Sequence, residues 1–376
     1  MERYYLAIDI GASSGRHMLG HIENGKMILE EIWRFENGMK DREGSLCWDL
    51  DALFEEIKTG MKRCKELGKI PVSMGIDTWA VDYVLLDEKD QVLGKTYGYR
   101  DGRTRGSDED VYKIISEEEL YSRTGIQKQS FNTIYQLMAV KKNNPEHLKA
   151  AKNFLMLPDY FHFLLTGQKC SEYTNATSTQ LINAQTNDWD WELIGRLGYP
   201  QEMFLPLSQP GTLVGSFTKE IEEEVGFSCE VVLPATHDTG SAVMAVPGEG
   251  DKNLYISSGT WSLMGIENKT AICTEESRKR NFTNEGGYEY RYRYLKNIMG
   301  LWMIQSVRKE LENKYSFAEL CAMASRRSDF PSRVDVNDPV FLAPDSMIRA
   351  IREMCAKTGH PVPETPDELA AVCMKA

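Results

Sequence analysis

A strand–turn–strand pattern that occurs twice, far apart in the chain, limits the possible folds more than any other feature of the sequence. In the first copy, the apolar segment Tyr4 to Ile10 leads through the turn Asp9-Ile10-Gly11-Ala12-Ser13-Ser14-Gly15 into a second strand-like segment, His17 to Ile22. Asn24-Gly25 then leads into a third such segment, Met27 to Phe35. Asn-Gly is a strong hairpin signal, because both central residues of a type I′ turn need a positive φ. We therefore predict three short strands joined by tight turns at the start of the chain.

The second copy of the pattern begins at Asn253. An apolar segment there ends in the small-residue turn Ser257-Ser258-Gly259-Thr260, Trp261 to Ile266 is strand-like, and Glu267-Asn268-Lys269 closes a hairpin. Copies this far apart are typical of two related domains and not of a solenoid, whose repeats recur every ~20–50 residues. The alternative is a chance likeness between two glycine-containing hairpins.

Helical and strand-like patterns are mixed between the two copies, which indicates an α/β fold. The predicted helices are Leu50–Leu67, Ser116–Tyr121, Asn132–Lys141 and Asp159–Leu165, and the predicted strands are Ser73–Ile76, Val81–Leu86 and Glu230–Pro234. A chain of 376 residues is too long for one ordinary domain. The turn cluster Val246–Asp251 predicts the boundary between an N-terminal domain at 1–246 and a C-terminal domain at 247–376.

Charge and composition favour a small-molecule partner. Lys and Arg total 44 against 56 Asp and Glu, so the net charge is −12, which argues against nucleic acid or an anionic membrane surface as the main partner. No apolar run approaches the ~20 residues of a membrane-spanning helix, and the first residues leave no room for a signal peptide. The eight cysteines are scattered without metal-site spacing. We expect a cytoplasmic protein with buried free thiols.

The two small-residue turns are candidate phosphate-binding sites. In Asp9 to Arg16 a carboxylate closes the strand, and small residues follow it. Small residues let a ligand approach the backbone closely, and exposed N–H groups in such turns suit phosphate oxygens. The turn at 257–260 has the same character, and neither turn matches the P-loop or Rossmann motifs. The alternative is that both are structural hairpins only.

Leu233-Pro234-Ala235-Thr236-His237-Asp238-Thr239 places a carboxylate directly after an apolar strand. Ligands of α/β proteins bind at that end of the strands. The alternative for Asp238 is a helix cap, because a segment of small, helix-compatible residues follows it. The alternative for His237 is an ordinary hydrogen-bonded loop residue.

Three further segments have polar or aromatic residues in unusual places. The strand around Gly75-Ile76-Asp77-Thr78-Trp79 combines Trp, Asp and Thr, which suits a sugar, although an ordinary edge strand fits as well. The basic segment Tyr99 to Arg105 is either an ion-paired surface loop or part of an anion site.

We predict one long amphipathic helix from Tyr294 to about Leu311. On it, Asn297 and Gln305 would face broadly the same way, within about 80°.

These motifs resemble those of the FGGY family of carbohydrate kinases. The matching runs extend over nearly the whole chain in family order: AIDIGASSGR, GIDTWAVDYVLLD, YRDGRT, LMLPDYF, EYTNATSTQL, ATHDT, YISSGTWSLMG, FTNEGGYEYRYRYLKNIMGLW and PVPETPDELA. The resemblance implies two ribonuclease H-like domains, as in actin-like ATPases, around a central cleft that holds sugar and ATP.

The resemblance also implies an activity, ATP-dependent phosphorylation of L-rhamnulose at its O1 hydroxyl, with Mg²⁺ arriving with ATP. Asp238 is then the general base, and Asp9 orients the magnesium through water. The residues implied to contact sugar are Ala80, His237, Asp238, Thr239 and Asn297. Those implied to contact nucleotide are Ala12, Ser13, Ser14, Gly15, Arg16, Thr260 and Gln305.

Two departures from the family pattern bear on this expectation. Ala80 stands where the family usually has Gly, so one extra methyl group would lie beside the sugar. Family members also continue beyond Ala376 with a Gly-rich loop that lies against adenine, so we expect an incomplete second domain. The alternatives are therefore a kinase for another ketose such as L-fuculose or D-xylulose, and a non-catalytic sugar-binding remnant. A chaperone-type ATPase shares the fold, but ATHDT and GIDTWAVDY favour a small polyol.

Overall fold

The computed structural model describes residues 3–248, 253–258, 262–298, 301–341 and 344–376. The chain divides into two compact units. The larger unit contains Met1–Asn253 and Ile266–Tyr294, and the smaller contains Leu254–Gly265 and Leu295–Ala376. The predicted boundary after residue 246 stays a prediction.

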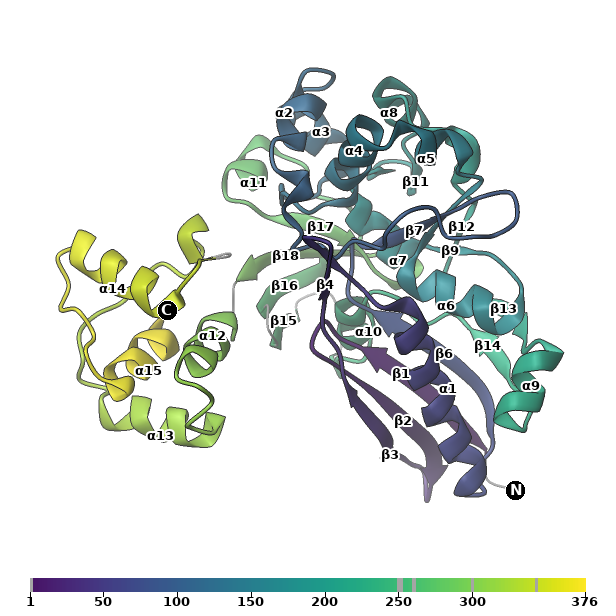
Figure 1. Cartoon of the computed structure of the whole chain (residues 1–376), viewed down its shortest axis with the longest axis horizontal. Coiled ribbons are helices and arrows are strands. Elements are labelled where there is room, and N and C mark those ends of the chain that lie inside the picture. The colour runs from purple at the N-terminus through teal and green to yellow at the C-terminus, as the bar shows by residue number, and fades with distance from the viewer. Residues whose placement is uncertain (1–2, 249–252, 259–261, 299–300, 342–343) are drawn as a thin grey trace. The chain divides into compact units, whose positions relative to one another are not determined.

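A six-stranded sheet forms the frame of the larger unit (Figure 1). Its order is β13 (Leu213–Ser216), β14 (Glu230–Val232), β6 (Pro71–Thr78), β1 (Tyr4–Ile10), β2 (Ser14–Glu23) and β3 (Lys26–Glu36). β1, β2 and β3 are antiparallel neighbours, whereas β6 runs parallel to both β1 and β14. The predicted three-strand opening is confirmed, and its turn has Asn24 at φ 49° and Gly25 at φ 75°.

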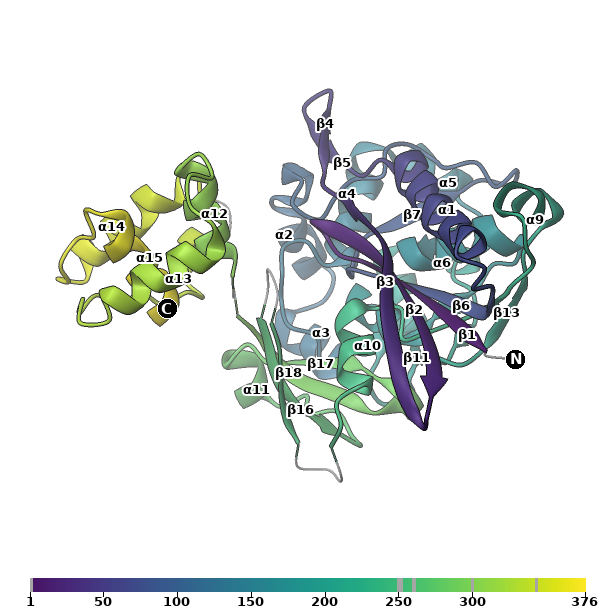
Figure 2. The same ribbon diagram turned by 90° about the horizontal axis from the view of Figure 1, so that it is seen from below.

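Helices α1 (Leu50–Glu66), α6 (Leu157–Thr166) and α9 (Lys219–Val225) pack with this sheet around one apolar core. The Asp49 side chain accepts a hydrogen bond from Ala52 N and so begins α1 as an N-cap. The rings of Phe54 on α1 and Phe161 on α6 stack 6.5 Å apart. Figure 2 shows α1 running along the sheet.

A second apolar core of the larger unit is built mainly from helices. Its helices and strands are α2 (Ser107–Tyr112), α3 (Glu117–Thr124), α4 (Thr133–Asn143), α5 (Pro145–Ala150), α8 (Trp191–Leu197), β7 (Tyr83–Leu86) and β8 (Asn153–Met156). Short strands complete the unit: β4 (Lys40–Arg42), β5 (Ser45–Cys47), β9 (Ser171–Glu172), β10 (Ile182–Asn183), β11 (Asp188–Trp189) and β12 (Leu207–Ser208).

The second copy of the pattern lies in a four-stranded sheet. Its order is β15 (Leu254–Ser258), β16 (Ser262–Asn268), β18 (Tyr292–Ile298) and β17 (Thr283–Gly286). Strands before and after the second small-residue turn are thus present as predicted, while residues 259–261 of that turn lie outside the described residues. Helix α11 (Glu275–Lys279) precedes β17.

The predicted helix from Tyr294 to Leu311 is wrong in its first part. Tyr294 to Ile298 belong to β18, and the helix, α12 (Trp302–Glu310), begins only at Trp302. Aromatic residues favour a strand here, and neighbouring strands supply the backbone partners that a helix would have supplied internally. Asn297 and Gln305 therefore do not share a helix face.

Four helices of the smaller unit pack around two apolar clusters: one around Met303, Phe341 and Ile351, and one in which Leu320 and Ala324 pack against Ile304 and Ala370. They are α12, α13 (Phe317–Arg326), α14 (Met347–Lys357) and α15 (Pro366–Lys375). Capping boxes begin α13 and α15. Cys321 on α13 is exposed, unlike the buried position expected for it.

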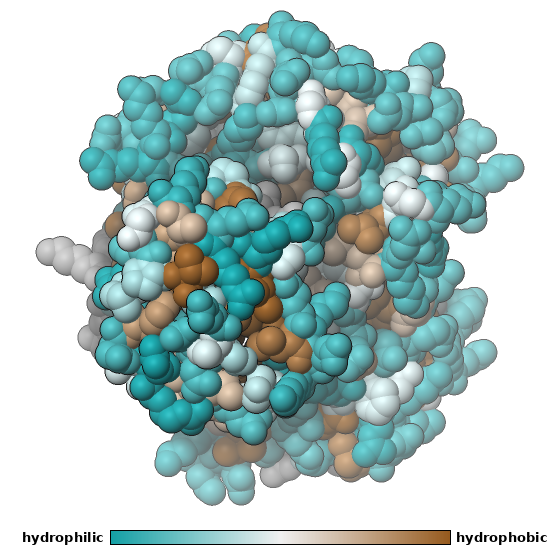
Figure 3. All heavy atoms as spheres, turned by 60° about the vertical axis from the view of Figure 1, so that its left-hand side comes forward, coloured by the Kyte–Doolittle hydropathy of each residue, from teal (hydrophilic) through white to brown (hydrophobic). Residues whose placement is uncertain are grey.

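Over the described ranges, no helix has the length and apolar character needed to cross a bilayer. On the face shown in Figure 3, hydrophilic side chains cover most of the surface, and apolar residues lie among them in small groups.

Candidate active site

Three parallel strands of the larger unit end at the same edge of the sheet, and the candidate site is built there. β1, β6 and β14 run in one direction, so their carboxyl ends lie together. Thr78 at the end of β6 forms a bridge with His237, and its N–H donates to Thr236 O at 2.9 Å. The loop after β14 is thereby held beside β6. Helix α10 (Asp238–Met244) begins directly after this bridge.

Carboxylates are concentrated at this edge. Asp9 is paired in register with Asp77 on one side and with Arg16 on the other. The Arg16 guanidinium lies 2.8 Å from Asp9 Oδ2. Burial and the neighbouring negative charges of Asp9 and Asp238 raise the pKa of Asp77 well above its usual range. These surroundings favour the protonated form of Asp77.

Asp238 is the carboxylate that opens α10. Its side chain is 33% exposed, and its Oδ1 accepts hydrogen bonds from the N–H and hydroxyl of Thr239 at 2.5 and 3.1 Å. Burial, followed by the charge of Asp9, raises the pKa of Asp238 to about 6. His237 and not Asp238 is the N-cap residue of α10, although the Asp238 carboxylate accepts one N–H of the first turn, that of Thr239. Asp238 is a partly exposed base that is mostly ionised at neutral pH.

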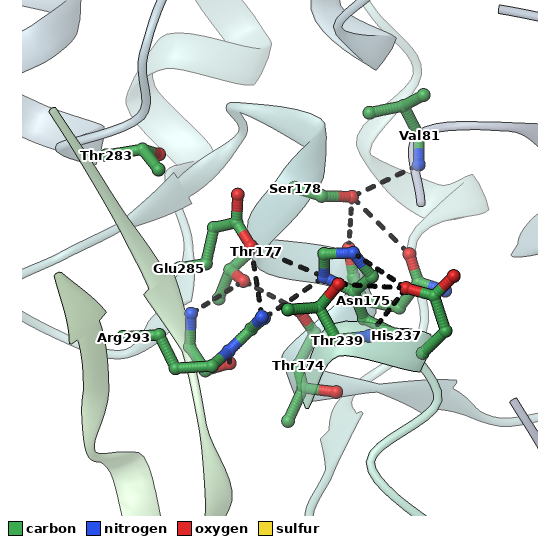
Figure 4. Close-up of polar contacts among 12 residues, drawn as sticks. Val81, Thr174, Asn175, Thr177, Ser178, His237, Thr239, Thr283, Glu285 and Arg293 are labelled. Carbon is green, nitrogen blue, oxygen red and sulfur yellow. Dashed lines mark hydrogen bonds and ion pairs between the residues drawn. The ribbon is translucent and has the colours of Figure 1, made fainter. Parts of the chain in front are cut away.

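His237 lies beside an ion pair of Glu285 and Arg293 that the sequence did not point to (Figure 4). Its Nδ1 is 3.1 Å from Arg293 Nη2 and 3.4 Å from Glu285 Oε2, and its Nε2 is 3.5 Å from Asp238 Oδ1. Arg293 Nη1 and Glu285 Oε2 are 3.1 Å apart. Burial and the Arg293 charge lower the pKa of His237 well below its usual range, so the imidazole is neutral.

Glu172 connects the His237 loop to the neighbouring helix α7 (Tyr173–Ala176). This fully buried carboxylate accepts from Thr236 N at 3.0 Å and Thr236 Oγ1 at 2.7 Å. It also accepts from Thr174 N, Thr174 Oγ1 and Asn175 N. Burial raises the pKa of Glu172, while these donors stabilise its charged form. Sequence reasoning missed Glu172, although a single acidic residue before the uncharged run 173–187 was an available signal.

The loop after β6 contains Ala80 and, directly after it, a residue with a strained backbone, Val81. Val81 has a φ of 68°, which is uncommon for a β-branched residue. Its N–H donates to Ser178 Oγ at 3.3 Å, and its carbonyl accepts from Thr133 Oγ1 at 2.7 Å. These two contacts hold Val81 in place, and the preceding residue, Ala80, is half-buried.

Trp79 does not offer its ring to a ligand. It is 6% exposed, and its indole N–H donates to the buried Asp82 at 2.9 Å. Trp48 donates to the same Asp82 oxygen at 2.6 Å. The Trp79 ring, one of the features that suited a sugar, is therefore packed in the apolar core.

The basic segment has a structural role at its centre. Arg103 donates to Gln136 Oε1 at 2.7 Å, and its guanidinium lies 4.1 Å from the centre of the Tyr97 ring. Arg103 is thus held inside the protein and not in a surface ion pair.

The first small-residue turn is held by Asn37. Gly11 N donates to Ser14 O at 2.9 Å, and Asn37 Nδ2 donates to Gly11 O at 2.8 Å. A Cβ at Gly15 would lie 2.1 Å from the Phe35 ring. The position of that ring therefore leaves room only for glycine. Ala12 and Ser14 are half-buried, while Ser13 and Arg16 are exposed. The exposed part of the turn is accessible to a ligand.

The predicted site residues are therefore only partly brought together. At the edge of the sheet where β1, β6 and β14 end, the structure brings together Asp9, Arg16, His237, Asp238 and Thr239. Thr260 lies outside the described residues, and Asn297 and Gln305 belong to the smaller unit, on β18 and α12.

The residues present fit a magnesium ion that stays bound to ATP. Among the described residues there is no group of three or more His, Cys, Asp or Glu side chains able to hold a metal. Mg²⁺ usually keeps several waters and binds through one or two carboxylates and the phosphates. The side chain of Asp9 is 31% exposed, and its carboxylate would fit such an ion.

Comparison with protein families agrees with this architecture. Residues 4–245 match the N-terminal domain, and residues 254–376 the C-terminal domain, of the FGGY family of carbohydrate kinases. The rhamnulokinase of Halalkalibacterium halodurans is 57% identical over 98% of this chain and 78% of its own length. The rhamnulokinase of Bacillus subtilis is 44% identical over 97% of this chain and 75% of its own.

Solved structures show the same fold. The ligand-bound xylulose kinase from Lactobacillus acidophilus superposes with a TM-score of 0.76 at 16% identity, covering 99% of this chain and 75% of that one. The gluconate kinase of the same species also superposes with a TM-score of 0.76, at 17% identity, over 100% of this chain and 76% of that one. The predicted α/β class and actin-like kinase fold are confirmed. The chain belongs to the FGGY family of carbohydrate kinases.

Proposed function

We propose that this protein transfers the γ-phosphoryl group of ATP to the O1 hydroxyl of L-rhamnulose. The sugar is inferred from relatives named rhamnulokinase at 44–57% identity. The structural observation that carries the proposal is Asp238, a partly exposed carboxylate at the carboxyl edge of the sheet with a pKa of about 6. Such a group is mostly ionised at neutral pH and is a stronger base than an ordinary aspartate.

In the proposed reaction the Asp238 carboxylate accepts the proton as the O1–H bond breaks. O1 forms a bond to the γ-phosphorus, and the bond from that phosphorus to the bridging oxygen of ADP breaks. In-line positioning and neutralisation of the phosphate charge account for most of such a rate enhancement. His237, Thr239, Ala80 and Asn297 are proposed to position the sugar.

The nucleotide is proposed to bind at the first small-residue turn. Ser13 and Arg16 are exposed in this turn, and a hydroxyl, a guanidinium and small neighbouring residues suit phosphate oxygens. Thr260 and Gln305 are proposed to contact the nucleotide as well. Magnesium bound to ATP would be held through water by Asp9 and would neutralise phosphate charge during transfer. We propose a cytoplasmic location, because all eight cysteines are free thiols.

The test is ADP release by the purified chain with Mg-ATP and, in parallel, L-rhamnulose, L-fuculose and D-xylulose. We expect release with L-rhamnulose, and its loss in Asp238→Asn, which keeps the size of the side chain and removes the base. Glu88→Ala, a change at an exposed residue outside the site, is the control. Release that is strongest with another ketose would overturn the sugar, and full activity of Asp238→Asn would overturn the base.

A further inference from the structure

Each ring nitrogen of His237 has a defined neighbour (Figure 4). Nδ1 faces the Arg293–Glu285 pair, with Arg293 Nη2 at 3.1 Å and Glu285 Oε2 at 3.4 Å. Nε2 faces Asp238 Oδ1 at 3.5 Å. A neutral imidazole carries one proton, so the neighbours decide which nitrogen donates and which accepts.

Arg293 and Glu285 favour opposite tautomers of His237. A guanidinium only donates, so a hydrogen bond from Arg293 requires an unprotonated Nδ1. A carboxylate only accepts, so a bond to Glu285 would require Nδ1–H. The contact with Arg293 is shorter and has hydrogen-bond geometry, while Glu285 Oε2 is already 3.1 Å from Arg293 Nη1. The geometry therefore favours Arg293 as the partner of Nδ1.

We infer that Arg293 is a positioning residue that holds His237 in the tautomer protonated at Nε2. His237 is then a hydrogen-bond donor beside the carboxylate of Asp238. The distance from Nε2 to Asp238 is too long for a good hydrogen bond, so the Nε2–H is available to a substrate oxygen. That its acceptor is a sugar oxygen rests on the proposed function, but the tautomer itself does not.

The position of the guanidinium is itself well defined. Arg293 Nε donates to Gly286 O at 3.1 Å, and Gly286 N donates to Thr177 Oγ1 at 2.9 Å. A Cβ at Gly286 would lie 2.6 Å from Tyr173, so glycine lets β17 approach helix α7 closely. On the other side, a Cβ at Gly240 would lie 3.6 Å from Arg293 Cζ. With only 1% of its surface exposed, Arg293 has little freedom to turn away from His237.

The tautomer is measurable by nitrogen NMR of the whole chain labelled with ¹⁵N in its histidine rings. There are six histidines, and His237→Asn identifies the signals of His237. Two buried histidines serve as internal references. His17 Nε2 lies 3.0 Å from the Ile57 carbonyl, so it must carry the proton, and burial lowers the pKa of His17 to about 4. His162 Nε2 accepts from Ile76 N–H at 3.0 Å, so its proton is on Nδ1, and burial lowers its pKa to about 3.

At pH 7 both references are neutral and represent the two tautomers. We expect the nitrogen shifts of His237 to match those of His17. Shifts that match His162 would overturn the inference outright. Glu285→Gln should leave the His237 tautomer unchanged, because Arg293 and not Glu285 is the partner of Nδ1. Any change of tautomer in that variant would contradict this assignment.

Removing Arg293 alone would leave Glu285 buried without its partner, so the pair is replaced together in Arg293→Met/Glu285→Met. We expect His237 in this variant to lose its pure Nε2–H signature, and an unchanged signature would overturn the role of Arg293. Sugar phosphorylation by the double variant should fall roughly tenfold or more in kcat/KM, as loss of one oriented hydrogen bond predicts. Arg291→Met is the matched control. If the wild-type chain phosphorylates no ketose, the proposed function fails while the tautomer is still decided by NMR.

Discussion

Asp9 and Asp77 lie opposite each other in the register of the parallel strands β1 and β6. Burial, followed by the charges of Asp9 and Asp238, raises the pKa of Asp77, and burial followed by the charge of Asp9 raises the pKa of Asp238 to about 6. Burial together with negative charge at one sheet edge thus makes Asp238 a stronger base than an ordinary aspartate.

The pH dependence of the reaction should report this base. Asp238 accepts a proton only when ionised, so kcat/KM should fall as the pH drops through about 6, the pKa of Asp238. The measurement is initial-rate kinetics between pH 5 and pH 8. In Asp238→Asn, activity should fall about 10²–10⁴-fold, and the step near pH 6 should disappear from what remains. A wild-type profile without that step would argue against Asp238.

Replacing Glu172 should weaken both the fold and the site. In Glu172→Ala the buried donors of Thr174 and Thr236 lose their acceptor, at a cost of about 3 kcal/mol or more in the free energy of unfolding. Urea denaturation measures this cost. The exposed control Glu88→Ala should stay within about 0.5 kcal/mol of wild type.

Glu172→Gln separates charge from packing at the same position. It keeps the shape of the side chain but turns one acceptor into a donor, so it should recover part of the stability and less of kcat/KM. Full recovery of both would show that the carboxylate charge is not needed to hold the His237 loop.

Gly15 should tolerate no side chain while Phe35 is present. Gly15→Ala would place a methyl group 2.1 Å from the Phe35 ring, and forced movement of a buried ring costs about 1–3 kcal/mol. Thermal unfolding and the KM for ATP should both worsen. Phe35→Leu should restore part of the stability of Gly15→Ala. Gly38→Ala, where no atom lies within 4 Å of the added Cβ, is the matched control.

Ala80 should influence which sugar is accepted. Ala80 lies between the buried Trp79 and the strained Val81. Hydrogen bonds hold both of these neighbours, so Ala80→Gly removes one methyl group from a fixed loop. Ala80→Gly should change the ratio of kcat/KM between L-rhamnulose and L-fuculose by up to about tenfold, because one methyl group is worth about 1 kcal/mol or more in a binding pocket. An unchanged ratio across the ketoses would place Ala80 away from the sugar.

The sequence by itself determined the elements whose signals are local. Asn24-Gly25 predicted its hairpin because only certain residues adopt positive φ easily, and the apolar spacing of residues 50–67 predicted α1. The position of Asp238 after a strand also followed from the sequence, because strand, turn and helix are neighbours along the chain.

Only the tertiary structure decided the features that depend on contacts between distant segments. Residues 294–298 became a strand because neighbouring strands satisfy their backbone groups, which no local pattern records. Trp79 turned inward because the buried Asp82 accepts its indole N–H. Arg293 contacts His237, which is 56 residues away in the sequence. Glu172 contacts Thr236, which is 64 residues away. The electrostatics of the site come from burial and from charges on separate strands, and these exist only once the chain is folded.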